Sequence, residues 1–200
     1  MIKKVFVDLD NTLLPFDTVI PVWREILKGG LIPKVSRISL RFGTQSLPKS
    51  LMVSCFAGIS MKEYNKFFLT IAQQFVYKID FAVKNWAEDL VKDKNEIHIV
   101  TGSLSSLANA ISEMLGWGQS VGTEVETKDG ALTGRLNSPA VKGSQKVDAI
   151  RNVLRFENDE FYFCAAAGDS YGDRHLLQKC SLQYFPKKTS DRLKKYFNKK

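Results

Sequence analysis

The sequence has no long apolar run and few cysteines or histidines. No stretch reaches the ~18 apolar residues that a membrane-spanning helix needs. The start MIKKVFVDLD also lacks a secretory hydrophobic segment, so we expect a cytoplasmic protein. The three cysteines are odd in number and widely spaced, which favours reduced, buried thiols over a disulfide framework or a zinc site. Neither histidine stands beside a serine or cysteine in a recognisable hydrolase motif, so a Ser-His-Asp mechanism has no support.

The composition is that of a globular chain, but the charge is uneven. Of the 200 residues, 44% are hydrophobic and 25% are charged, which suits one sizeable core. Much of the formal charge of +8 lies in the last residues, 187–200, where six lysines and Arg192 surround Leu193, Tyr196 and Phe197. A basic amphipathic helix of this kind can contact an anionic membrane or nucleic acid. The alternative, favoured by the short apolar face, is a solvated last helix that docks on the core.

The most informative segment is the amino-terminal run KKVFVDLDNTLLPFDT. Its apolar residues 5–7 are typical of a buried parallel strand, so Asp8 and Asp10 lie at the carboxyl end of that strand. Open α/β sheets bind ligands at this end. Two neighbouring carboxylates need compensation, which a hard divalent cation provides through oxygen ligands. The alternative is a simple turn after the strand, and Asn11 is a common turn residue.

Three further segments carry polar residues in similar places. NEIHIVTGS predicts a second buried strand that ends in Thr101 and Gly102, and a hydroxyl followed by a glycine amide suits a phosphate oxygen. FYFCAAAGDSYGD predicts another apolar strand around Phe163, with Asp169 directly after it and Asp173 four residues later. Between these segments, VKGSQKVDAIRNVL places a lysine at the start of an amphipathic helix.

The remaining residues predict helices and one hairpin. From Asp17 to Asn85 the pattern indicates helices over 19–28, around 32–42, from near Pro48 and after Ser60. A crossover helix is expected over 104–115, and the segments 121–125 and 131–136 flank a hairpin turn at 128–130.

We therefore predict an α/β fold with a Rossmann-like three-layer core and an inserted helical cap. Strands around Phe6, Ile99, Val121, Phe163 and Leu182 give a parallel sheet of about five strands. Right-handed crossovers bring the strand tips to one edge. Residues 1–16 and 86–200 form the expected catalytic core, and residues 17–85 form the cap, which excludes water and supplies selectivity.

Taken together and in this order, the four segments resemble the haloacid dehalogenase superfamily of phosphohydrolases. The stretch GTEVETKDGALTGRLNSPAVKGSQK is similar to the linking region of its phosphoserine-phosphatase-like branch. The resemblance covers residues 3–16 and about 96–187, whereas residues 17–95 match only in position and helical character. It implies a Mg²⁺-dependent phosphomonoester phosphatase that acts through an aspartyl phosphate on a small phosphorylated metabolite.

The resemblance also implies roles for the carboxylates. Asp8 is the nucleophile, and Asp10 is the general acid and later the base, while its backbone carbonyl binds the metal. Asp169 is a further metal contact beside Asp8, and Asp173 is an indirect ligand or a supporting carboxylate. For Asp173, an ordinary acid in the first turn of a helix is the alternative. Mg²⁺ suits these oxygen ligands and keeps water and phosphate oxygens in its shell.

Four other residues complete the site that the resemblance implies. Thr101 and the Gly102 amide hold the phosphoryl group, and a lysine neutralises its charge. Lys146 fits the spacing of the family, whereas Lys142 also fits a surface charge. Asp17 stands nine residues after Asp8, where phosphoserine phosphatases carry an acidic residue that contacts the substrate amine. An amino-terminal helix cap explains Asp17 equally well.

Two other functions remain open at this point. A phosphotransferase would hand the phosphoryl group to an alcohol instead of water. A non-catalytic binding protein would use the basic tail to hold anionic lipid or nucleic acid. The combined presence of the carboxylates, the threonine and the lysine argues against the second alternative, and the leaving group of the substrate is left unspecified.

Overall fold

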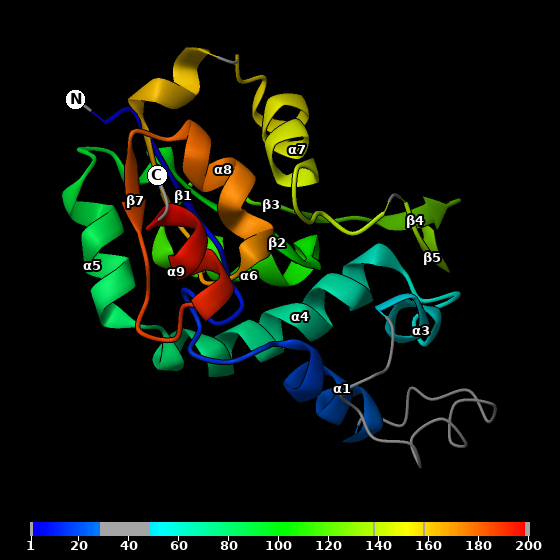
Figure 1. Ribbon diagram of the computed structural model, residues 1–200. Coiled ribbons are helices and arrows are strands. Elements are labelled where there is room, and N and C mark those ends of the chain that lie inside the picture. The colour runs from blue at the N-terminus through cyan, green and yellow to red at the C-terminus, as the bar shows by residue number, and fades with distance from the viewer. Residues whose placement is uncertain (1, 29–48, 138, 158, 199–200) are drawn as a thin grey trace.

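The centre of the molecule is a five-stranded parallel sheet with the strand order β3-β2-β1-β6-β7 (Figure 1). The computed structural model describes residues 2–28, 49–137, 139–157 and 159–198. The strands are β1 (Lys4–Val7), β2 (Ile97–Leu104), β3 (Val121–Thr123), β6 (Cys164–Ala167) and β7 (Leu182–Tyr184). This arrangement confirms the predicted α/β fold, and it places β1 between β2 and β6.

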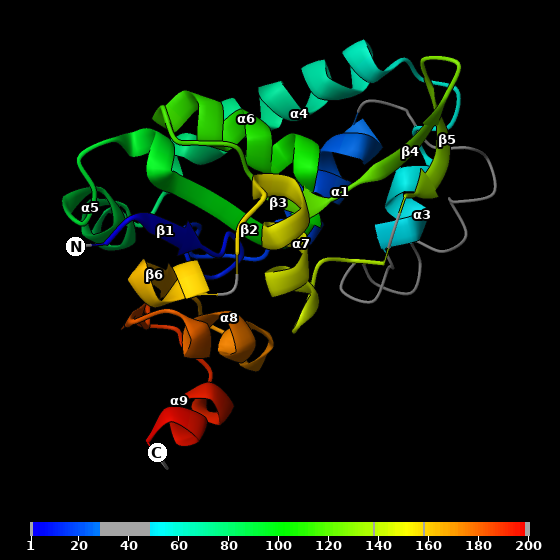
Figure 2. The ribbon, with the colours of Figure 1, turned by 90° about the horizontal axis from the view of Figure 1, so that it is seen from above.

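Helices cover both faces of the sheet, and the alternation of side chains along β1 reflects this. Val5 and Val7 belong to a hydrophobic cluster shared with α4 (Met61–Phe75) and α6 (Ser105–Leu115). Phe6 belongs to a second cluster shared with α7 (Gln145–Leu154) and α8 (Arg174–Lys179). Successive strand residues point to opposite faces, so these clusters are the two interfaces of a three-layer core. Figure 2 shows α4 and α6 side by side, across β1 from α8 and α9 (Asp191–Phe197).

Local sequence signals account for the helices between the first two strands. The helix predicted over 19–28 is α1 (Val19–Lys28), and the helix predicted near Pro48 is α3 (Lys49–Ser54). Ser60 begins α4 through a capping box, in which its hydroxyl accepts from the Glu63 amide and the Glu63 side chain accepts from the Ser60 amide. The helix predicted over 32–42 lies outside the described residues.

The predicted boundary between cap and core falls inside a helix. Helix α5 (Phe81–Asp89) spans the predicted boundary between residues 85 and 86. The helix begins before that boundary because Asp80 caps it, accepting hydrogen bonds from the amides of Ala82 and Val83. Helix α4 packs against α6, and residues of α1, α3, α4 and α6 share one hydrophobic cluster. The division into a catalytic core and a cap over 17–85 stays a prediction.

Two predicted strands are placed differently in the structure. Phe163 ends the 3-10 helix η5 (Asp159–Phe163), so β6 begins only at Cys164. Residues 121–123 pair with β2 instead of forming the hairpin, whose arms are β4 (Val125–Lys128) and β5 (Ala131–Leu136). The hairpin turn itself is confirmed, since Asp129 and Gly130 both have positive φ, at 51° and 81°, as a type I′ turn requires. Gly122 allows β3 to approach α6 closely, because a Cβ there would lie 2.8 Å from the Ser105 Cα atom.

The carboxyl-terminal segment docks on the core beside both loops that follow β1 and β6. Leu193 of α9 is fully buried. Ahead of it, the Ser190 amide donates to the Asp169 carbonyl (2.8 Å) and the Lys188 ammonium donates to the Pro15 carbonyl (2.9 Å). The last helix therefore docks as the solvated-helix alternative expects, and its contact with a membrane or nucleic acid stays a prediction. Among the described residues, the structure shows no helix with the length and apolar character needed to cross a bilayer.

Candidate active site

The loop after β1 is a closed turn that holds Asp8 at the edge of the sheet. The Asp8 amide donates to the Ala167 carbonyl of β6 (3.0 Å), and the Asp8 carbonyl accepts from the Leu13 amide (3.1 Å). Asn11 takes a positive φ of 57°, which an asparagine tolerates in a tight turn. Asp8 thus stands on a backbone that is fixed by hydrogen bonds on both sides.

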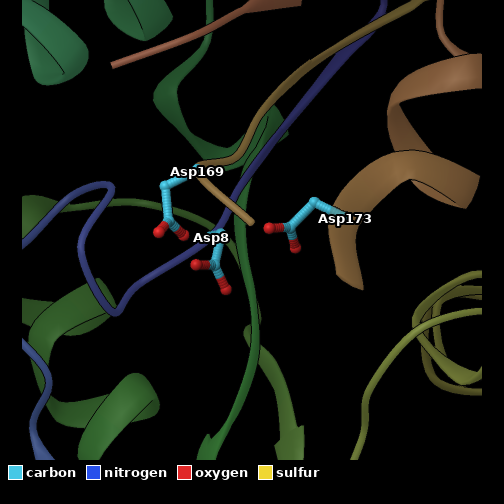
Figure 3. Close-up of side chains that lie close together, drawn as sticks. All are labelled: Asp8, Asp169 and Asp173. Atoms are coloured by element: carbon cyan, nitrogen blue, oxygen red, sulfur yellow. The ribbon is translucent and has the colours of Figure 1, made fainter. Parts of the chain in front are cut away.

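Three carboxylates meet at this edge. Asp8 comes from the tip of β1, Asp169 from the loop after β6, and Asp173 from the end of the 3-10 helix η6 (Tyr171–Asp173). One oxygen of each lies within 4.8 Å of the others, and Figure 3 shows the three side chains converging. Asp8 and Asp173 are buried and Asp169 is half-buried. Ser170 orients Asp173 by donating both its amide (3.0 Å) and its hydroxyl (2.8 Å) to the Asp173 Oδ2 atom.

A buried lysine lies between two of these carboxylates. The Lys146 Nζ atom, in the first turn of α7, is 2.6 Å from an oxygen of Asp8 and 2.6 Å from an oxygen of Asp173. Lys146 is only 4% exposed, whereas Lys142 is exposed. Of the two predicted candidates, Lys146 is therefore the one in contact with Asp8.

Burial and charge shift the pKa values in this cluster. Burial raises the pKa of Asp8 to about 8 despite the attraction of Lys146. Burial and the Asp173 charge raise the pKa of Asp169 to about 6. Burial alone would lower the pKa of Lys146, but Asp173 and Asp8 raise it above its usual value, so the ammonium is protonated. Three carboxylates with one ammonium leave an excess of negative charge among hard oxygen donors. This donor set fits a divalent cation such as Mg²⁺.

The Asp10 carboxylate makes its hydrogen bonds away from this cluster. Its Oδ1 atom accepts from the Thr18 amide (2.8 Å), and its Oδ2 atom accepts from the Ser103 hydroxyl (2.5 Å). Asp10 nevertheless lines the same cavity as Asp8. That its backbone carbonyl binds a metal stays a prediction.

A cavity of about 260 Å³ opens above the carboxylates. Its lining includes Asp8, Asp10, Asp17, Lys49, Gly102, Lys142, Lys146, Asp169 and Asp173. Gly102 is therefore on the wall, as a phosphate-binding amide requires. Thr101 is fully buried, and its hydroxyl accepts from the Ser103 amide (3.0 Å). The contact of the Thr101 hydroxyl with a phosphoryl group stays a prediction.

Two residues of this region carried no signal in the sequence. Lys49, at the start of α3, donates to the Gly102 carbonyl and lines the cavity, and burial lowers its pKa. Ser103 is the last residue of the segment NEIHIVTGS, and its hydroxyl contacts Asp10, a contact that the sequence did not predict. Asp17 lines the cavity, and its Oδ1 atom accepts from the Val19 amide (2.8 Å) at the start of α1, as the helix-cap alternative expects. Its contact with a substrate amine stays a prediction.

The parallel sheet and the carboxylates clustered at its edge are typical of an α/β enzyme, and the sequence matches the model of one enzyme family. Residues 5–178 match the model of the haloacid dehalogenase-like hydrolases. The chain belongs to this family, which confirms the predicted superfamily.

The chain is similar to a phosphoserine phosphatase of Archaeoglobus fulgidus, with 22% identity over 182 residues, 90% of this chain and 51% of that protein. It is also similar to a phosphoserine phosphatase of Methanocaldococcus jannaschii, with 23% identity over 187 residues, 90% of this chain and 83% of that protein. The chain thus spans about half the length of the Archaeoglobus relative. A crystal structure of a protein of unknown function from Bordetella pertussis Tohama I has the same fold, with a TM-score of 0.79 and 18% identity over 100% of this chain and 96% of that one.

Proposed function

We propose that this chain is a phosphomonoester phosphatase that uses Asp8 as its nucleophile and acts on a small phosphorylated metabolite. The observation that carries this proposal is the position of Lys146, a buried ammonium 2.6 Å from both Asp8 and Asp173 at the floor of the cavity. An ammonium at this point offsets the charge of a phosphoryl group that approaches Asp8. The names of the Archaeoglobus and Methanocaldococcus relatives support the same class of reaction.

The reaction has two steps that the described residues can perform. In the first, an Asp8 oxygen attacks phosphorus, the bond from phosphorus to the leaving oxygen breaks, and Asp10 gives its proton to that oxygen. In the second, Asp10 takes a proton from a water molecule, which attacks the aspartyl phosphate. Inorganic phosphate leaves and the Asp8 carboxylate is restored. The Gly102 amide and Lys146 hold the phosphoryl oxygens in both steps.

Mg²⁺ fits the same carboxylates. Asp8 and Asp169 would hold it directly, together with the backbone carbonyl of Asp10, and Asp173 would support them. When bound, the ion supplies positive charge that draws phosphate oxygens toward Asp8.

Phosphoserine is the first substrate to test. Asp17 offers a carboxylate for an amine, and Lys49 and Lys142 offer ammonium groups for a carboxylate, all on the wall of the same cavity. The names of the Archaeoglobus and Methanocaldococcus relatives also support phosphoserine as the substrate to test first.

The cytoplasmic location also stays a prediction.

The test is the release of inorganic phosphate from a panel of phosphomonoesters in the presence of Mg²⁺. We expect the wild-type protein to hydrolyse at least one member and Asp8→Asn to lose at least about 10³-fold in kcat, because the nucleophile is removed. Asp89→Asn is the matched control, since Asp89 is exposed at the end of α5. Asp89→Asn should unfold at the wild-type temperature, and Asp8→Asn should keep the wild-type circular dichroism spectrum, which shows that its loss of activity is not a loss of fold. Retained activity in Asp8→Asn would contradict the proposal, and a phosphoester formed with an added alcohol would identify a phosphotransferase instead.

A further inference from the structure

The carboxyl group of Asp10 is held on both of its oxygens by residues from different parts of the chain. The Thr18 amide donates to Oδ1 (2.8 Å), and the Ser103 hydroxyl donates to Oδ2 (2.5 Å). The hydroxyl oxygens of Thr18 and Ser103 are themselves 2.9 Å apart. Thr18 and Ser103 are each only 2% exposed. Both donors are therefore shielded from bulk water, while Asp10 itself is half-buried on the cavity wall.

With Asp10 ionised, the number of hydrogens fixes the direction of this chain of hydrogen bonds. A serine hydroxyl has one hydrogen, and Ser103 donates it to Asp10. The Thr18 hydroxyl must then donate to Ser103. Thr18 thus acts on Asp10 twice, directly through its amide and indirectly through Ser103. Two donors at two oxygens fix the plane of the carboxyl group as well as its position.

The position of Ser103 connects this contact to the phosphoryl site. Ser103 follows Gly102 in β2, and Gly102 is on the cavity wall. The same strand end therefore presents the amide that faces the phosphoryl group and the hydroxyl that holds the proton donor. Neighbouring residues of one strand end therefore connect the cavity wall with the carboxyl group of Asp10.

We infer that Ser103, supported by Thr18, is a positioning residue that aims the Asp10 carboxyl at the oxygen of the leaving group. This inference rests on the proposed function, in which Asp10 protonates that oxygen. The lining of the cavity above the carboxylates, as the structure describes it, does not include Ser103, so Ser103 acts through Asp10. Its effect on the first step, which kcat/KM reports, is confined to substrates whose leaving group needs a proton, because Asp10 matters least for the others in that step.

The test compares two substrates in Ser103→Ala. For an alkyl phosphate, whose alkoxide is a poor leaving group, kcat/KM should fall about 10- to 100-fold, with most of the loss in kcat. For 4-nitrophenyl phosphate, whose leaving group needs little protonation, the loss should stay below about threefold. Ser103→Thr keeps the hydroxyl and should restore the wild-type ratio between the two substrates.

Ser106→Ala is the matched control. Ser106 is a buried serine in α6 whose hydroxyl donates to the Asn65 side chain (2.9 Å), so this variant also loses a buried hydrogen bond but leaves Asp10 untouched. It should lower kcat/KM equally for both substrates or not at all. An equal loss on both substrates in Ser103→Ala would show a purely structural role and overturn the inference.

A second measurement does not depend on turnover. In a double-mutant cycle of thermal unfolding, the losses in Tm from Ser103→Ala and Asp10→Ala should not add in the double variant, because both remove the same hydrogen bond. Additive losses would overturn the inference. If the wild-type protein hydrolyses no phosphomonoester, the proposed function fails, while the cycle still decides whether Ser103 holds Asp10.

Discussion

Replacing Lys146 by methionine should separate the stability of the site from its chemistry. Methionine keeps most of the volume of the side chain but removes the ammonium that lies 2.6 Å from both Asp8 and Asp173. The carboxylates of Asp8, Asp169 and Asp173 then lose the one positive charge that lies among them. Removing one partner of a buried ion pair costs about 3–5 kcal/mol. For a chain of this size, 1 kcal/mol shifts Tm by roughly 2–4 °C, so we expect a loss of roughly 6–20 °C in chelator.

Mg²⁺ should raise the stability of this variant without restoring its activity. The more negative cluster attracts the cation more strongly, so Mg²⁺ should raise the Tm of Lys146→Met by more than it raises the wild-type Tm. Phosphatase activity should remain at least about 10²-fold below wild type, because the charge on the transferring phosphoryl group is no longer offset.

The assay is a thermal melt with chelator and with excess Mg²⁺, followed by phosphate release. Lys142→Met is the control, since Lys142 is an exposed lysine on the same cavity wall, and it should change stability by less than about 0.5 kcal/mol. An unchanged Tm for Lys146→Met in chelator, or full activity with Mg²⁺, would refute the reasoning.

Three further predictions follow from the described residues. Burial raises the pKa of Asp8 to about 8 and, with the Asp173 charge, that of Asp169 to about 6, so protons compete with a cation. Affinity for Mg²⁺ should therefore rise from about pH 5 to pH 8 with proton release, and calorimetry that shows no pH dependence would contradict this. Gly118→Ala should destabilise by at least about 1–3 kcal/mol in chemical denaturation, because its Cβ would lie 2.1 Å from the Asn95 carbonyl oxygen; wild-type stability would argue against that packing. Burial raises the pKa of the Cys164 thiol to about 12, so iodoacetamide should label it far more slowly in the native than in the unfolded protein at about pH 8, and equal rates would disprove this.

The sequence predicts the parts of the site that depend on local pattern and topology. Short apolar runs mark the strands, and parallel strands present their carboxyl ends at one edge, so Asp8 and Asp169 could be placed together in advance. Lys146 followed from its position at the start of an amphipathic helix and from the spacing of the family. The helix over 19–28 was predicted with its observed bounds because Gly29 and Gly30 follow it.

The remaining features depend on where side chains point across long separations in the sequence. Ser103 and Asp10 are 93 residues apart, and Lys49 and the Gly102 carbonyl are 53 apart, so no local pattern reports either contact. The Thr101 hydroxyl bonds to the backbone of its own strand end, a choice of rotamer that the letters TGS do not specify. The strand expected around Phe163 begins one residue later because the aromatic run forms a 3-10 turn first.

The carboxyl-terminal segment has a consequence for when the site is completed during synthesis. Its contacts to the Pro15 and Asp169 carbonyls join the loop that is translated first to the loop after β6. Residues 188–193 leave the ribosome after every carboxylate of the cluster has emerged. Domains fold as units as they emerge, so a nascent chain stalled before Leu193 holds all the reacting groups but lacks one of the segments that contact both loops. The contacts of this segment with both loops thus become available only in the last stage of translation of this region, after the residues that pair β1 with β6 and form the ion pairs of Lys146 have emerged.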